Sequence, residues 1–133
     1  MNHRFLVFAV VMLMALAGCA SQEDEASVGF ENLPVGNPSE GERLYTDRIN
    51  NEPRCSDCHS LDGSPNLGPT LQGYGEIAAQ RVAGLSAGEY TLQSIVRPWA
   101  HVVEGFNNIM PTRYTHTMTD QQIADLIAFI ITQ

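Results

Sequence analysis

Residues 55–59 read Cys55-Ser56-Asp57-Cys58-His59, the five-residue pattern C-x-x-C-H. This pattern is the attachment signature of a c-type haem. Two thiols at this spacing can form thioethers with the two vinyl groups on one edge of a porphyrin, and the histidine that follows can ligate the iron. The stretch therefore predicts one covalent haem c, attached through Cys55 and Cys58, with His59 as an axial ligand of the iron.

Three other interpretations of the two cysteines stay open on the residues alone. A structural zinc site usually takes four nitrogen or sulfur ligands, often as two close pairs, and no cysteine follows Cys58. A thioredoxin-like redox pair needs a βαβ setting, which the sequence does not predict. A disulfide between Cys55 and Cys58 is possible, but it would make His59 a coincidence.

The N-terminus has the pattern of a secretory signal. Arg4 lies in a short basic start, an unbroken apolar run covers residues 5–17, and small residues follow. The run is shorter than the roughly 20 residues that a membrane-spanning helix needs. We expect residues 1–18 to be a signal peptide that is removed on export.

The end of this signal, Leu16-Ala17-Gly18-Cys19, resembles the lipobox of bacterial lipoproteins. The resemblance implies that the Cys19 thiol is lipidated and becomes the first residue, and that the protein is anchored to a bacterial membrane, facing the periplasm or the cell exterior. Ala20 in second place favours the outer membrane, by the same resemblance. Stable anchoring needs more than one acyl chain. The alternative is an ordinary secretory signal with an incidental Cys19.

The composition is acidic and contains no lysine. The formal net charge is −8 over 133 residues, and loss of Arg4 with the signal makes it one unit more negative. This charge argues against nucleic acid or anionic lipid as the main partner, and it favours a redox protein with a basic docking face. Part of the excess lies in residues 19–36, so a solvated linker explains some of it. No small-molecule substrate is expected.

The rest of the chain predicts one all-α domain over residues 37–133, preceded by an acidic flexible tether over residues 19–36. Three capping boxes, in which a hydroxyl is followed three residues later by Glu or Gln, predict the helix starts. They are Ser39-x-x-Glu42, Ser86-x-x-Glu89 and Thr119-x-x-Gln122. We expect three main helices: one over about 40–50, one from about 87 to the residue before Pro98, and one from about 120 to the end. A short helix is expected over 76–83. Gly and Pro crowd residues 63–75, which predicts a loop.

The haem motif, the Gly/Pro loop, the Met110-Pro111 pair and an apolar C-terminal helix together resemble class I c-type cytochromes, over residues 38–132. The resemblance implies the cytochrome c fold, with three main helices and a short one packed around a single haem. It implies that Met110 is the sixth iron ligand, and Pro111 favours an extended Met110 that can reach the iron. Met118 is an alternative, although it fits a hydrophobic staple before Thr119 better. His101 and His116 are candidates for a bis-histidine haem.

The same resemblance implies further roles around the haem. The Pro69 carbonyl is expected to accept a hydrogen bond from the His59 ring. Gly41 and Tyr45 are expected to cross Leu126 and Phe129 where the first and last helices meet. Candidates to bind the haem propionates are Tyr74, Arg97 and Trp99. A candidate to donate a hydrogen bond to the Met110 sulfur is Asn107 or Asn108.

These expectations point to an electron-transfer protein rather than an enzyme. With His59 and Met110 both on the iron, no coordination position is open for a substrate. The preferred hypothesis is a lipid-anchored one-electron carrier that serves a respiratory oxidase or reductase. The alternatives are a fixed haem c subunit of a larger membrane redox complex, and a haem enzyme or gas sensor with an open sixth site.

Overall fold

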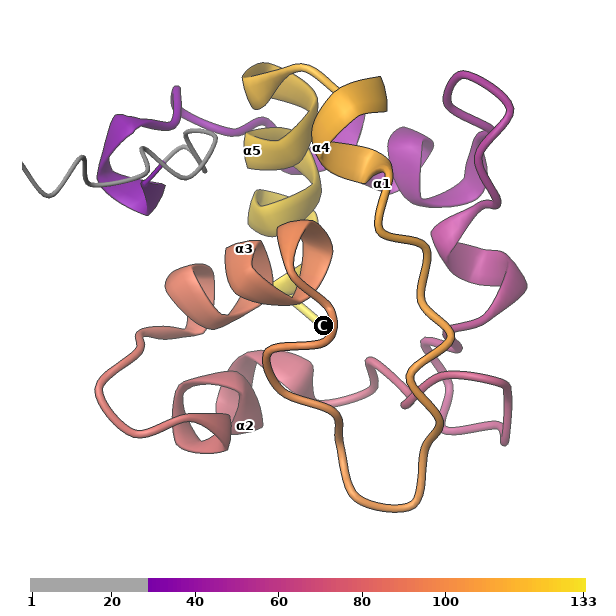
Figure 1. Cartoon of the computed structure of the whole chain (residues 1–133). Helices are drawn as coiled ribbons and strands as arrows, with labels where there is room; N and C mark the ends of the chain where they lie inside the picture. The colour runs from indigo at the N-terminus through magenta and orange to yellow at the C-terminus, as the bar shows by residue number, and fades with distance from the viewer. Residues whose placement is uncertain (1–28) are drawn as a thin grey trace, which may run out of the picture.

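The computed structural model describes residues 29–133, which form an all-helical domain without strands. The predicted signal peptide, Cys19 and the start of the predicted tether lie outside the described residues. Two 3₁₀ helices and five α-helices follow in order: η1 (Phe30–Asn32), α1 (Pro38–Thr46), η2 (Cys55–Asp57), α2 (Tyr74–Arg81), α3 (Ala87–Val96), α4 (Tyr114–Thr117) and α5 (Asp120–Ile130) (Figure 1). The all-α prediction is confirmed.

Helices α1 and α5 cross with their backbones in direct contact, and this crossing is the structural centre of the domain. A Cβ atom added to Gly41 would lie 2.0 Å from the Asp125 carbonyl oxygen and 2.6 Å from Phe129 Cβ. A glycine costs a helix about 1 kcal/mol relative to alanine, but only glycine allows the two backbones to approach so closely. The Tyr45 and Phe129 rings pack beside it with centroids 5.6 Å apart. The predicted crossing of the first and last helices is confirmed.

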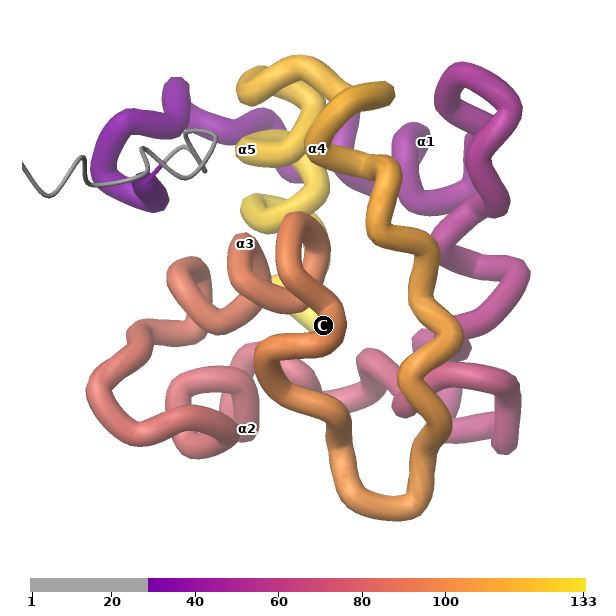
Figure 2. The backbone as a smooth tube through the Cα atoms, viewed as in Figure 1, coloured from indigo at the N-terminus to yellow at the C-terminus, as the bar shows by residue number. Residues whose placement is uncertain are grey.

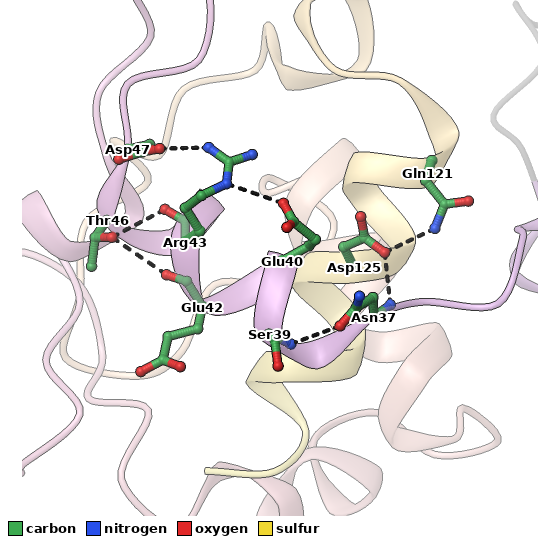
Figure 3. Close-up of polar contacts among 9 residues, drawn as sticks. All are labelled: Asn37, Ser39, Glu40, Glu42, Arg43, Thr46, Asp47, Gln121 and Asp125. Atoms are coloured by element: carbon green, nitrogen blue, oxygen red, sulfur yellow. Dashed lines mark hydrogen bonds and ion pairs between the residues drawn. The ribbon is translucent and has the colours of Figure 1, made fainter.

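A buried carboxylate fastens the start of α1 to α5. Asp125 is 6% exposed, and its Oδ1 accepts hydrogen bonds from the Asn37 backbone N–H at 2.7 Å and from Gln121 Nε2 at 2.8 Å (Figure 3). Asn37 is also the N-cap of α1, because its side chain accepts from the Ser39 N–H at 3.0 Å. The sequence prediction of Ser39 as the cap was therefore wrong. Pro38 takes the first helical position, where a missing N–H costs nothing.

The other two predicted capping boxes are confirmed. Ser86 caps α3 with Glu89, and Thr119 caps α5 with Gln122. Helix α1 ends at Thr46 instead of near Asn50, and α2 begins at Tyr74, two residues before the expected start. Helix α4 was not predicted, because its four residues are too few to show a helical period.

The part of the predicted tether that the structure describes is packed against the domain. The Phe30 ring lies where a Cβ of Gly88 in α3 would stand, and Gln121 of α5 donates to the Val35 carbonyl at 3.0 Å. Gly36 lies against the Ala124 carbonyl of α5. Residues 29–36 therefore contact the helical domain directly, although they belong to the stretch that the sequence predicted as a tether. The stretch has no helical or strand period, so the sequence did not indicate these contacts, which involve the Phe30 ring, the Leu33 side chain, a backbone carbonyl and glycines.

The core lies between α1, α3 and α5, and long loops surround it. Figure 2 shows the longest of them, residues 97–113, as an arc between α3 and α4 without helical turns. Among residues 29–133, no helix is long and apolar enough to cross a membrane.

Candidate functional site

A largely apolar cavity of about 330 Å³ opens beside the C-x-x-C-H stretch. Its walls come from all five α-helices of the described domain and from the segments between them, at 47–59, 67–71 and 98–111. The four residues that the sequence predicted to attach the haem or to ligate its iron all line this one cavity: Cys55, Cys58, His59 and Met110. Cavities of this size and apolar character are typical of ligand and cofactor sites.

The two cysteines reach the same side of the chain because of η2. In a 3₁₀ helix, side chains three positions apart eclipse one another, and Cys58 follows Cys55 by three. The Cys58 and His59 N–H groups both donate to the Cys55 carbonyl, at 3.1 and 2.9 Å. Both thiols are free in the structure, so a disulfide between them is absent.

Burial raises the pKa of the Cys55 thiol to about 11, so this thiol is protonated at neutral pH. Thioredoxin-like redox cysteines have the opposite property, a lowered pKa. Residues 29–133 also contain no group of three or more His, Cys, Asp or Glu side chains that could hold a metal ion. The structure therefore favours neither the redox-pair nor the zinc interpretation.

Two neighbours orient the His59 ring, and a third holds its backbone. Its Nδ1 lies 2.7 Å from the Pro69 carbonyl oxygen, the contact that the family resemblance implied. Since a carbonyl only accepts, Nδ1 carries the proton, and Nε2 keeps its lone pair for a metal. Gly68 lies against the ring, because a Cβ there would stand 2.6 Å from His59 Cε1. The Tyr45 hydroxyl donates to the His59 backbone carbonyl.

Burial of the ring also lowers the pKa of His59, against the opposing effect of the Pro69 hydrogen bond. A neutral imidazole is the form that ligates metals. The ring is thus held in both the tautomer and the protonation state that a proximal iron ligand requires.

Two methionines line the cavity. Met110 is half-buried and packs against the core from the loop 97–113. Met118 is 8% exposed and belongs to the core cluster together with Ile123, as the hydrophobic staple predicted. An extended loop can direct a side chain into the cavity, whereas Met118 is packed into the core directly before α5.

The remaining predicted residues are divided between the cavity and the outside. Pro69, Tyr74, Asn107 and Asn108 line it. The Tyr74 hydroxyl lies 3.0 Å from Thr91 Oγ1, and Thr91 itself donates to the Ala87 carbonyl. The Tyr74 proton is therefore engaged with Thr91, where sequence reasoning expected a propionate.

Arg97 and Trp99 do not line the cavity, and Trp99 is 53% exposed. Their propionate contacts stay predictions without geometric support. His101 does line the cavity and packs edge-on against Tyr90 with ring centroids 5.6 Å apart, whereas His116 is exposed and lies elsewhere. The structure thus brings one of the two bis-histidine candidates to the site.

Sequence reasoning missed the charged residues of the cavity wall. They are Asp47, Arg54 and Arg81. Arg81 is half-buried on α2 and makes no ion pair among the described residues. The sequence around Arg81 did not indicate that it lines the cavity, because a basic residue at a helix C-terminus is already favoured by the helix dipole.

The cavity residues fit a covalently attached haem. Two thiols at attachment spacing, an imidazole with a free Nε2 and a thioether share one largely apolar chamber that a planar macrocycle could fill. In comparison with known families, the Cytochrome c model matches residues 38–133. No curated protein matches the chain.

Proposed function

Because the chain belongs to the cytochrome c family, whose members bind covalent haem c, we propose that it is a lipid-anchored one-electron carrier for a respiratory oxidase or reductase. The observation that carries this proposal is the common cavity of two thiols, one oriented imidazole and one loop thioether. Such a set saturates the iron and leaves no position for a substrate.

Each residue has a distinct task in this proposal. Cys55 and Cys58 attach the haem, and His59 and Met110 ligate its iron. When bound, the haem supplies a reversible one-electron change at the iron. The Pro69 carbonyl fixes the His59 tautomer and raises the basicity of the ring. The Met110 thioether and the apolar wall favour the reduced form.

Arg81 is the residue that we assign to the propionates. A half-buried cation without a protein partner is costly unless an anion joins it, and a propionate is the anion that the cofactor brings. In the holoprotein, Arg81→Gln should lower the midpoint potential, because loss of a nearby positive charge favours the oxidised iron. An Arg97→Gln variant is the matched control; a larger shift from that variant would return the role to Arg97.

The ligand assignment is tested on the matured ferric protein by its sulfur-to-iron charge-transfer band. Met110→Ala should abolish the band and allow the reduced protein to bind carbon monoxide. Met118→Leu, which keeps the staple apolar, should leave the band in place. A band that survives Met110→Ala would contradict the assignment, and ready carbon monoxide binding by the wild type would support the haem-enzyme or sensor alternative.

Membrane anchoring is tested separately. The lipobox resemblance supports a lipid on Cys19, so a Cys19→Ala protein should leave the membrane fraction. Its persistence there after a salt wash would contradict the anchor.

A pull-down of the mature protein from detergent-solubilised membranes should identify a basic redox partner. Stoichiometric recovery of a stable complex would instead indicate a fixed subunit.

A further inference from the structure

The loop that carries Met110 is weakly held along most of its length. Among residues 29–133, no hydrogen bond or ion pair joins residues 98–112 to any part of the domain outside residues 97–113. Its backbone bonds are local, such as Phe106 N–H to the Val103 carbonyl at 3.1 Å. The position of Met110 therefore depends on packing and on how the two ends of the loop are fastened.

The end nearest Met110 is fastened to the segment directly before the haem cysteines. Arg113 Nε lies 3.3 Å from Glu52 Oε1, and the Tyr114 hydroxyl donates to the Pro53 carbonyl at 3.0 Å. Asn50 Nδ2 donates to the Thr117 carbonyl. We name these three contacts, between residues 50–53 and residues 113–117, the clamp.

Two of the clamp's side chains, Glu52 and Tyr114, are buried, whereas Arg113, the partner of Glu52, is exposed. Glu52 is only 7% exposed, so its carboxylate requires the Arg113 partner. Tyr114 is buried as well, and burial is the main reason that its pKa is raised. Asn50 and Asn51 both have positive φ, 49° and 67°, a conformation that asparagine tolerates better than most residues. This turn directs the chain so that Glu52 faces inward.

The clamp joins two segments that lie within three residues of Cys55 and of Met110, on the two sides of the cofactor cavity. Pro53 lies two residues before Cys55, and Arg113 lies three residues after Met110. Pro53, Cys55, Met110 and Tyr114 all line the same cavity. Fixing residues 113–114 to residues 52–53 therefore limits how far Met110 can move from the haem-attachment segment.

We propose that Glu52, Arg113 and Tyr114 are positioning residues that hold the Met110 loop closed and thereby keep the thioether on the iron. This inference rests on Met110 being the sixth ligand, as argued under Proposed function. Loss of a clamp contact raises the population of an open loop, in which Met110 is off the iron.

The test uses imidazole binding to the ferric holoprotein, followed by loss of the sulfur-to-iron charge-transfer band. An imidazole nitrogen can take the sixth position only when Met110 has left it, so the apparent Kd is inversely proportional to the open fraction. Glu52→Gln and Tyr114→Phe should each lower the apparent Kd about tenfold, a factor that corresponds to about 1.4 kcal/mol. Arg113→Gln, a change at a largely exposed side chain, should act in the same direction and covers the case in which a buried variant does not fold.

The matched control is Glu40→Gln, which removes the carboxylate of an exposed ion pair with Arg43 on α1. Its imidazole affinity should stay within about twofold of the wild type. The clamp is refuted if the clamp variants that fold also stay within about twofold. A wild-type protein that lacks the band would instead overturn the ligand assignment, and that result is visible before any variant is made.

Discussion

The α1–α5 crossing and the loop 97–113 are held in contrasting ways. At the crossing, two backbones lie in direct contact at Gly41, and the buried Asp125 carboxylate fastens the start of one helix to the other. The loop has no polar contact with the rest of the described domain between residues 98 and 112. The Tyr45 hydroxyl of α1 ties the His59 backbone to this crossing, whereas Met110 lies on a segment whose polar contacts with the rest of the domain are confined to its ends.

The two regions therefore contribute different properties to the domain. The crossing combines direct backbone contact with a buried hydrogen bond, whereas the loop is fastened at its ends. In the proposed function the loop supplies Met110 to the iron, and the clamp controls its attachment. Variants in each region should separate these two roles, from the largest expected effect to the smallest.

Removing the cofactor should affect both regions. A Cys55→Ala, Cys58→Ala chain cannot attach the haem, so the apolar walls of the 330 Å³ cavity lose the group that would cover them. A small domain has a total stability of only about 5–15 kcal/mol, so losing this apolar burial should be a large effect. We expect no cooperative thermal transition in far-ultraviolet circular dichroism. A haem-free chain that melts as sharply as the holoprotein would show that the helical scaffold does not need its cofactor.

Gly41→Ala should damage the scaffold without acting on the loop. The added methyl meets the Asp125 carbonyl, and such overpacking costs about 3 kcal/mol or more. Denaturant unfolding of the holoprotein measures this loss. Ser39→Ala on the same helix should change stability by less than about 0.5 kcal/mol, since Asn37 is the actual cap. Equal stabilities of the two variants would refute the close crossing.

Asp125→Ala should loosen one end of the scaffold. The Asn37 N–H loses its acceptor, which costs about 1–3 kcal/mol when the donor is left unsatisfied. Amide hydrogen exchange should become faster at the start of α1 and stay unchanged in residues 98–112. Glu42→Ala, at an exposed position of α1, is the control. Faster exchange in the loop would mean that the two regions are coupled more strongly than their contacts indicate.

The smallest effect concerns α3, from which the loop departs. Hydrogen bonding by Ser86 lowers the pKa of the Glu89 carboxyl below its ordinary value of 4.5. A lowered folded-state pKa means that the stabilisation is present above pH 4.5 and is lost as the pH falls through the lower, folded-state value. The stability difference between wild type and Glu89→Gln should therefore shrink on acidification from neutral pH. A difference that grows in acid would have the wrong sign for this cap.

Patterns within a few residues determined what the sequence could predict about this protein. The C-x-x-C-H stretch indicated the cofactor, and the capping boxes at Ser86 and Thr119 located the starts of α3 and α5, because attachment and capping both act over three or four positions. The family resemblance added Met110, Pro69 and the crossing at Gly41. Met110 and Pro69 line the cavity, and Gly41 lies at the crossing of α1 and α5.

Only the tertiary structure decided the contacts between distant segments. It joined the Asn37 N–H to Asp125, packed residues 29–36 onto the domain, and brought Arg81 instead of Arg97 to the cavity wall. It also joined Glu52 to Arg113 and Pro53 to Tyr114, residues about sixty positions apart. Such contacts leave no period or spacing in the sequence, because burial and pairing depend on which surfaces the folded chain brings together.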